Sequence, residues 1–215
     1  MSLRALYVVL VALAAPAAAN AQAVSDSGTF LVRRGKDTVA TEQFVRTAIR
    51  LQGILALRNA KRTSERWTAV IAPDATLPLI EVTVQEGNQS LGAKARITQR
   101  ARVIFKEDSA AVDDLGQGGI QTRLFATEIG AVPYLNLSFA LLEQAVRRAR
   151  ASDDPGQVPL FNLGGGQTVL AKLSRTESDS VLLQIGDVRY DLRVDSTGRL
   201  LGARILSQGV VVERR

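Results

Sequence analysis

The sequence predicts a mainly β protein: a single curved antiparallel sheet, a half-barrel or open barrel of about ten to twelve strands, with one main α-helix packed on its concave face. Three observations support this. Short stretches of alternating apolar and polar residues, separated by turn residues, run from Gly28 onward. The segment 136–151 has helical periodicity instead. A helix with a broad apolar stripe must bury that stripe, and the nearest apolar surface is the sheet.

The first element is an N-terminal leader at 1–21. Arg4 precedes the apolar run 5–15, and the small residues 19–21 form a cleavage site, an order typical of a secretory signal peptide. The run is too short for a transmembrane helix, which needs about 20 apolar residues. We therefore expect export to the periplasm or the medium and cleavage near Ala21. A single antiparallel β domain over 22–215, without stable membrane insertion, should remain.

The first half of this domain consists of alternating stretches that predict strands. Residues 29–33 and 38–49 flank a turn at 34–37 and predict a hairpin. Glycine, proline and asparagine then separate the remaining strand candidates, which are 53–58, 66–72, 78–84 and 90–106. The connections are short, so we expect a meander.

The clearest alternation lies at 93–105. Ile97, Val103 and Phe105 fall on one face of an extended chain. The opposite face is basic and consists of Lys94, Arg96, Arg100 and Arg102. The segment predicts either one strand of about 13 residues, which is longer than usual and suits a curved sheet, or two strands with a tight break. The basic face either contacts an anionic envelope component or is a solvated sheet face that discourages edge aggregation.

The helix is predicted at 136–151 because Phe139, Leu142 and Val146 recur at helical spacing. Asn136 is the expected N-cap, and the arginines at 147, 148 and 150 complement the carbonyl end of the helix. The preceding segment, 116–132, is ambiguous between loop and short strand.

The C-terminal third returns to short alternations, with strands expected at 168–173, 181–185, 188–194, 199–206 and 210–214. Gly186-Asp187 suits a two-residue hairpin turn. The glycine run 164–166 lacks the lysine and spacing of a phosphate-binding loop and predicts a flexible turn into a strand.

Composition limits the chemistry. The chain contains neither cysteine nor histidine, which excludes disulfides, thiol catalysis and histidine-based catalytic triads. Lysine and arginine number 27 against 21 acidic residues, a modest excess that favours acidic partners, but aromatic residues are only 5% and do not suit a nucleic-acid platform. We expect no enzymatic activity, no cofactor, no metal site and no nucleic-acid partner.

In overall organisation the chain resembles the periplasmic carriers of lipoproteins and lipids, whose open half-barrel holds a hydrophobic guest under helical lids. The resemblance is based on the leader, the hairpin 29–36, the basic-faced strand 93–105 and the helix 137–149. It covers most of the mature chain and includes no specific motif, and this chain has one visible helix in place of several lids. It implies binding of a lipid, acyl chain or lipoprotein anchor without catalysis.

A curved sheet with a partly filled concavity forms an apolar pocket, which is the usual binding site. The expected lining is Phe139, Leu142 and Val146 from the helix, with Ile97, Val103 and Phe105 from the sheet. The alternative is a structural or interaction module of the cell envelope with a fully packed core and no ligand. A carboxylate-based enzyme acting on glycans is a third hypothesis.

Overall fold

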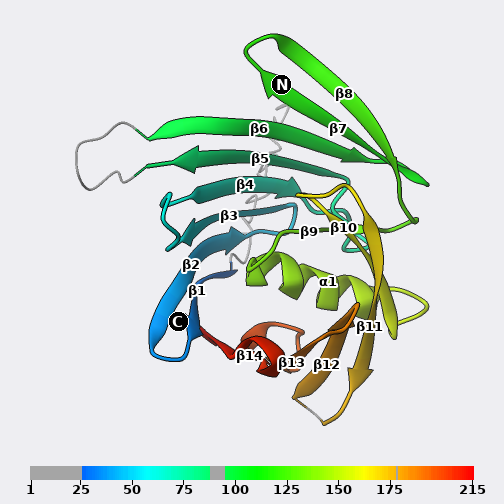
Figure 1. Ribbon diagram of the computed structural model, residues 1–215. Coiled ribbons are helices and arrows are strands. Elements are labelled where there is room, and N and C mark those ends of the chain that lie inside the picture. The colour runs from blue at the N-terminus through cyan, green and yellow to red at the C-terminus, as the bar shows by residue number, and fades with distance from the viewer. Residues whose placement is uncertain (1–25, 88–94, 178) are drawn as a thin grey trace, which may run out of the picture.

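A computed structural model describes residues 26–87, 95–177 and 179–215 of the chain. The leader and Lys94 lie outside these residues. The described part forms one 15-stranded sheet, one α-helix and a short 3-10 helix (Figure 1). The strands are β1 Asp26–Arg34, β2 Asp37–Arg46, β3 Arg50–Leu57, β4 Ser64–Val70, β5 Leu79–Glu86, β6 Arg96–Phe105, β7 Ser109–Gly116, β8 Gly119–Ala126, β9 Val132–Tyr134, β10 Gln157–Asn162, β11 Thr168–Arg175, β12 Ser180–Ile185, β13 Val188–Val194, β14 Leu200–Ile205 and β15 Val210–Arg214. The helix α1 spans Phe139–Ala151, and the 3-10 helix η2 spans Leu206–Gln208.

The sheet is a meander whose first strand, β1, lies at the centre of the strand order. Strands β1 to β8 follow one another to one edge, and the chain then crosses to the other edge, where β9 lies. Strands β10 to β15 return toward the centre, and β15 pairs antiparallel with β1, placing Arg214 opposite Phe30. The predicted antiparallel meander is confirmed except at β9 and β10, which pair in parallel.

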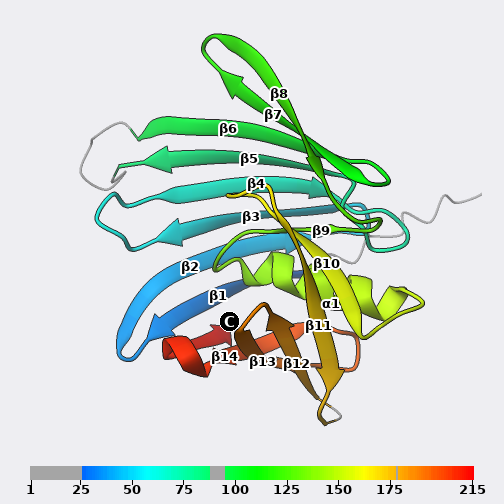
Figure 2. The same cartoon turned by 45° about the vertical axis from the view of Figure 1, so that its right-hand side comes forward.

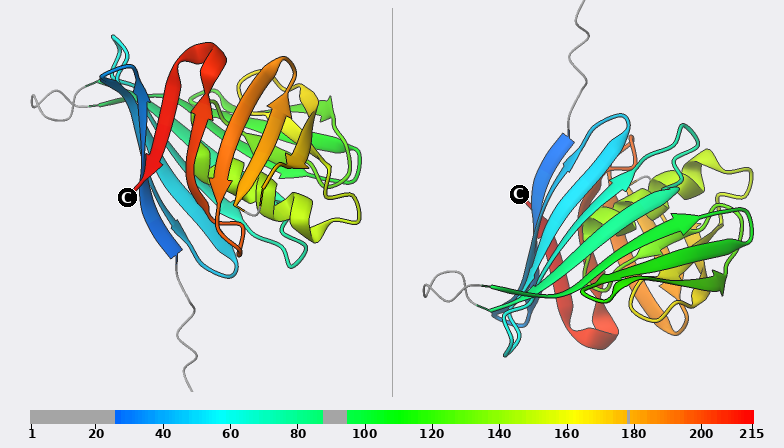
Figure 3. Two further views of the ribbon diagram at one scale, coloured as in Figure 1. Left: turned by 90° about the horizontal axis from the view of Figure 1, so that it is seen from below. Right: turned by 90° about the horizontal axis from the view of Figure 1, so that it is seen from above.

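The sheet curls around α1, so that the helix lies in its concavity (Figure 1 and Figure 2). Figure 3 shows the same enclosure from two further directions, with α1 between the two arms of the sheet. Register shifts at Val32/Arg33, Val84/Gln85 and Arg193/Val194 mark bulges, which increase local twist and bend a strand. The predicted fold class, a curved antiparallel sheet with one helix on its concave face, is confirmed.

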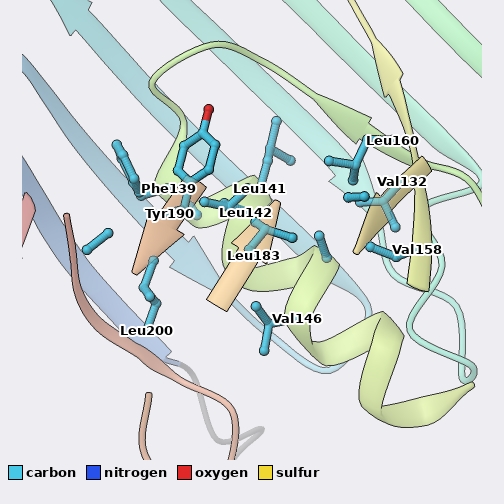
Figure 4. Close-up of a cluster of buried hydrophobic side chains, with 14 of the residues drawn as sticks. Val132, Phe139, Leu141, Leu142, Val146, Val158, Leu160, Leu183, Tyr190 and Leu200 are labelled. Atoms are coloured by element: carbon cyan, nitrogen blue, oxygen red, sulfur yellow. The ribbon is translucent and has the colours of Figure 1, made fainter. Parts of the chain in front are cut away.

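The apolar stripe of α1 packs between both arms. Phe139, Leu142 and Val146 are all at most 2% exposed. Figure 4 shows these side chains beside Leu183 of β12 and Leu200 of β14. Because sheet surrounds the helix on several sides, even Glu143 and Gln144 are fully buried and need polar partners.

The helix begins later than the sequence predicts. The N-cap is Ser138 and not Asn136, because Leu137 has a left-handed backbone with φ of 65°. Glu42 of β2 completes the cap. Its carboxylate accepts hydrogen bonds from the Ser138 hydroxyl at 2.5 Å and from the backbone amides of Phe139 and Ala140 at 2.7 and 2.9 Å. Burial raises the pKa of Glu42 to about 7, although these donors oppose the shift.

The sheet has more strands than the ten to twelve predicted, since the described residues form fifteen. The additional strands include β8 and β9, which resolve the ambiguous segment 116–132. Strand β8 is an edge strand exposed along most of its length, so its apolar and polar residues do not alternate. Strand β9 has only three residues, too few to show a period.

Candidate functional site

A cavity of about 220 Å³ lies on the concave face of strands β4 to β8. Short apolar side chains form most of its floor, together with the polar Gln99. Val82 lies opposite Ala101, and Val103 opposite Val112, so cross-strand register places them on the same face of the sheet. Val84 extends this apolar surface toward the Glu65 end.

The opposite end of the sheet closes over this floor. Phe161 of β10 lies between two rings from the other arm, with its centroid 6.0 Å from that of Phe125 and 5.4 Å from that of Phe105, both edge to face. The hydroxyls of Thr127 and Thr168 are 2.7 Å apart. The two ends of the open sheet therefore meet at the cavity, which we call the concave cavity.

The turn between β10 and β11 forms the roof, as the glycine run predicts. Asn162 stabilises this turn with two hydrogen bonds. Its side-chain oxygen accepts one from the Gly164 amide at 2.9 Å, and its backbone carbonyl accepts one from the Gly166 amide at 2.8 Å. Gly166 has φ of +71°, and a Cβ there would lie 2.4 Å from the Phe125 ring. Glycine is thus required both for the backbone conformation and for close contact with the aromatic wall.

Two charged residues lie on the lining, Glu65 of β4 and Arg123 of β8. Atom Oε2 of Glu65 is buried and has no hydrogen-bond partner among the described residues. Burial raises the pKa of this carboxyl above its ordinary value. The Arg123 guanidinium lies over the Phe125 ring, 5.7 Å from its centroid. The described lining therefore includes residues of five adjacent strands, β4 to β8.

The residues predicted to line one pocket lie in different places. Val103 lines the concave cavity, and Phe105 packs on its aromatic wall. Phe139 and Leu142 are core residues and are not on the cavity lining. Val146 lines a second hollow of about 340 Å³, between the end of α1 and β11.

Ile97 is 41% exposed because the bulge in the β5–β6 pair changes the phase of the alternation. Val84 lies opposite Gln99, but Gln85 lies opposite Ile97, so Ile97 is on the outer face of the sheet. Gln99 is a polar residue at an apolar position of the predicted strand, and this one interruption does not by itself identify a bulge.

The same bulge divides the predicted basic face. Arg100 and Arg102 project on the outer side of β6, whereas the register of Arg96 with Glu86 places it on the other side. Arg102 donates from Nε and Nη2 to Asp113 at 3.0 and 2.7 Å. The described members of this set therefore do not form one surface, and Arg102 has a partner within the sheet.

Sequence reasoning missed Glu65, Arg123, Phe125 and Phe161. The last two lie on short or exposed strands without clear alternation. Phe125 is near the glycine run in space and not in sequence, whereas Phe161 precedes the run by three residues. A larger hollow of about 500 Å³ lies on strands β12 to β15, but its lining includes the charged residues Asp191, Arg193, Arg204 and Glu213.

In the described parts of the chain, no helix is long and apolar enough to cross a bilayer. Nor do these parts contain a cluster of three or more acidic side chains placed to hold a metal ion.

A search against protein-family models gives no match, and a search of curated proteins gives none either. Among solved structures, the chain is similar to the crystal structure of a DUF1089 family protein from Pseudomonas aeruginosa. The TM-score is 0.54 and the sequence identity 12%, and the match covers 77% of this chain and 89% of that one. The two proteins share a β-rich sheet fold.

Proposed function

We propose that this protein is an exported, non-enzymatic binding protein that holds an apolar chain of a lipid-like molecule in the concave cavity. One observation supports this above the others: an apolar floor and two aromatic rings enclose space where the two ends of the open sheet meet. Cavities that are mainly apolar, with a few polar groups at their margins, are typical of small-molecule sites.

The size and shape of the cavity favour a single chain. Its volume of about 220 Å³ is below the roughly 300–1,000 Å³ of sites that enclose drug-sized ligands. Because the cavity crosses several strands, an extended chain fits it better than a bulky ring system. Glu65 and Arg123 can orient the polar end of an amphiphile.

The cavity also bears on the two alternative hypotheses. The alternative of a structural module expects a fully packed interior, and an apolar hollow beside the core argues against it. A glycan-cleaving enzyme of the usual kind needs two carboxyl groups within about 5–9.5 Å of each other. Glu65 is the one acidic residue on the described lining. Export remains an inference from the leader sequence.

The proposal is tested by filling the cavity. Ala101 faces the cavity from β6, and Ala111 of β7 is a matched control on the outer face, opposite Ile104. We expect Ala101→Phe to abolish the fluorescence gain of cis-parinaric acid, an extended polyene chain that suits the cavity shape. Ala111→Phe should retain that gain and its displacement by hexadecanol.

Circular dichroism and thermal melting check that both variants are folded. If folded Ala101→Phe binds the probe as well as the wild type, or the wild type does not bind it saturably, the proposed function is wrong.

A further inference from the structure

A second site lies beside α1 and shares no lining residue with the concave cavity. It is a recess of about 390 Å³ with three arginines on its lining, Arg46 of β2 and Arg147 and Arg150 of α1. The described lining, which we call the arginine recess, includes no carboxylate. It therefore presents a concentrated positive charge to any ligand.

The ion pairs behind the recess compensate this charge only in part. Four arginines share two carboxylates there. Glu143 is within ion-pair distance of Arg46, Arg147 and Arg214, at 3.6, 3.1 and 2.8 Å. Asp26 pairs with Arg199 at 2.7 Å, with Arg214 at 2.6 Å and more distantly with Arg147. Asp195 lies near Arg199 and adds a third carboxylate, and Arg150 adds a fifth arginine, so the whole group has an excess of two positive charges.

Arg46 is the member whose hydrogen bonds are least satisfied. Its side chain is 10% exposed, and atoms Nε and Nη2 are buried without a hydrogen-bond partner among the described residues. Only Nη1 donates, to the side-chain oxygen of Gln144. Burial lowers the pKa of Arg46 to about 10. Buried donors without partners cost free energy.

We propose that the arginine recess binds a phosphate group, either inorganic phosphate or the phosphate monoester of a larger molecule. The planar fork of a guanidinium donates two parallel hydrogen bonds to phosphate oxygens, and arginine is the preferred residue for this geometry. A phosphate dianion also matches the excess of two positive charges. This site is independent of the proposed apolar ligand.

Isothermal titration calorimetry in a phosphate-free buffer tests the proposal with two probes, inorganic phosphate and the short-chain lipid dihexanoylphosphatidic acid. The key variant is Arg150→Gln, since Arg150 is exposed and donates a hydrogen bond to the Ser196 carbonyl at 3.2 Å. Arg189→Gln, on the exposed side of β13, is the matched control.

We expect saturable binding of at least one probe, a Kd raised about tenfold in Arg150→Gln, and an unchanged Kd in Arg189→Gln. Binding of phosphate alone assigns the site to the free anion, and tighter binding of the lipid assigns it to a lipid headgroup. A second variant, Arg147→Gln, should weaken binding to a similar degree. If neither probe binds the wild type, or if both recess variants bind as the wild type does, the proposal is overturned.

Discussion

At the scale of single residues, Glu65 is the least compensated group of the concave cavity. Its Oε2 atom is buried beside valine side chains with no hydrogen-bond partner among the described residues. Residues that lower the stability of the free protein are common at binding sites, because the side chains that bind a ligand are often not those that would give the most stable fold. A ligand with a hydrogen-bond donor would satisfy this carboxyl.

Replacement of Glu65 should therefore stabilise the free protein. We expect Glu65→Gln to raise the free energy of unfolding by about 1 kcal/mol near pH 8. A carboxyl whose folded-state pKa is raised contributes most below its ordinary value of 4.5, and that contribution is lost as the pH rises through the folded-state pKa. The advantage of the variant should consequently disappear near pH 4.

Urea unfolding at the two pH values checks this, with Glu81→Gln on the exposed face of β5 as the control. Equal stability of Glu65→Gln and the wild type near pH 8 would contradict the assignment of Glu65 as an unsatisfied buried carboxyl.

At the scale of elements, the β10–β11 turn determines how closely the two ends of the sheet meet. Gly166 and Gly186 both have a left-handed backbone, with φ of +71° and +56°. They differ in their surroundings, since a Cβ at Gly186 would meet nothing within 4 Å, whereas one at Gly166 would collide with Phe125. The pair therefore separates backbone strain from steric contact.

We expect Gly186→Ala to cost about 1–2 kcal/mol, the price of a left-handed alanine. Gly166→Ala should cost at least about 1 kcal/mol more, because Phe125 must also move. Chemical denaturation measures both. Equal losses would show that the aromatic wall does not depend on the turn.

The helix and most strands could be predicted because their signals are local. Periodicity identified α1, and alternation matched β13 and β15 to the residue. The N-cap was misplaced because the decisive partner, Glu42, lies 96 residues from Ser138 in sequence. Strand β8 was ambiguous because its partners lie on one side only, so most of its side chains are exposed and unconstrained in polarity.

At the scale of the whole molecule, the sheet behaves as a nearly closed barrel. Its two ends do not pair as strands, yet Phe125 meets Phe161 and Thr127 meets Thr168 across the gap. The concave cavity exists because of this approach, and α1 lies in another part of the concavity.

The sequence predicts the concavity, but it does not predict which part of the concavity is packed and which part is a cavity. Periodicity shows that Phe139 and Leu142 face the sheet, yet it cannot show that they fill the space they face. Val103 could be placed on the lining because the alternation from Gln99 to Ile104 keeps one register with β5. Ile97 could not, because it lies on the other side of the bulge. The arginine recess depends on residues from β2 and α1, about 100 positions apart in sequence.

A methyl NMR titration of the protein with hexadecanol tests directly whether the concave cavity binds an apolar chain. We expect saturable shifts of the Val82, Val84, Val103 and Val112 methyl signals, which lie on the cavity lining. The Leu182 and Val211 signals, in the charged hollow on β12 to β15, should not move. Shifts confined to Leu182 and Val211, or no saturable shift at all, would contradict this proposal.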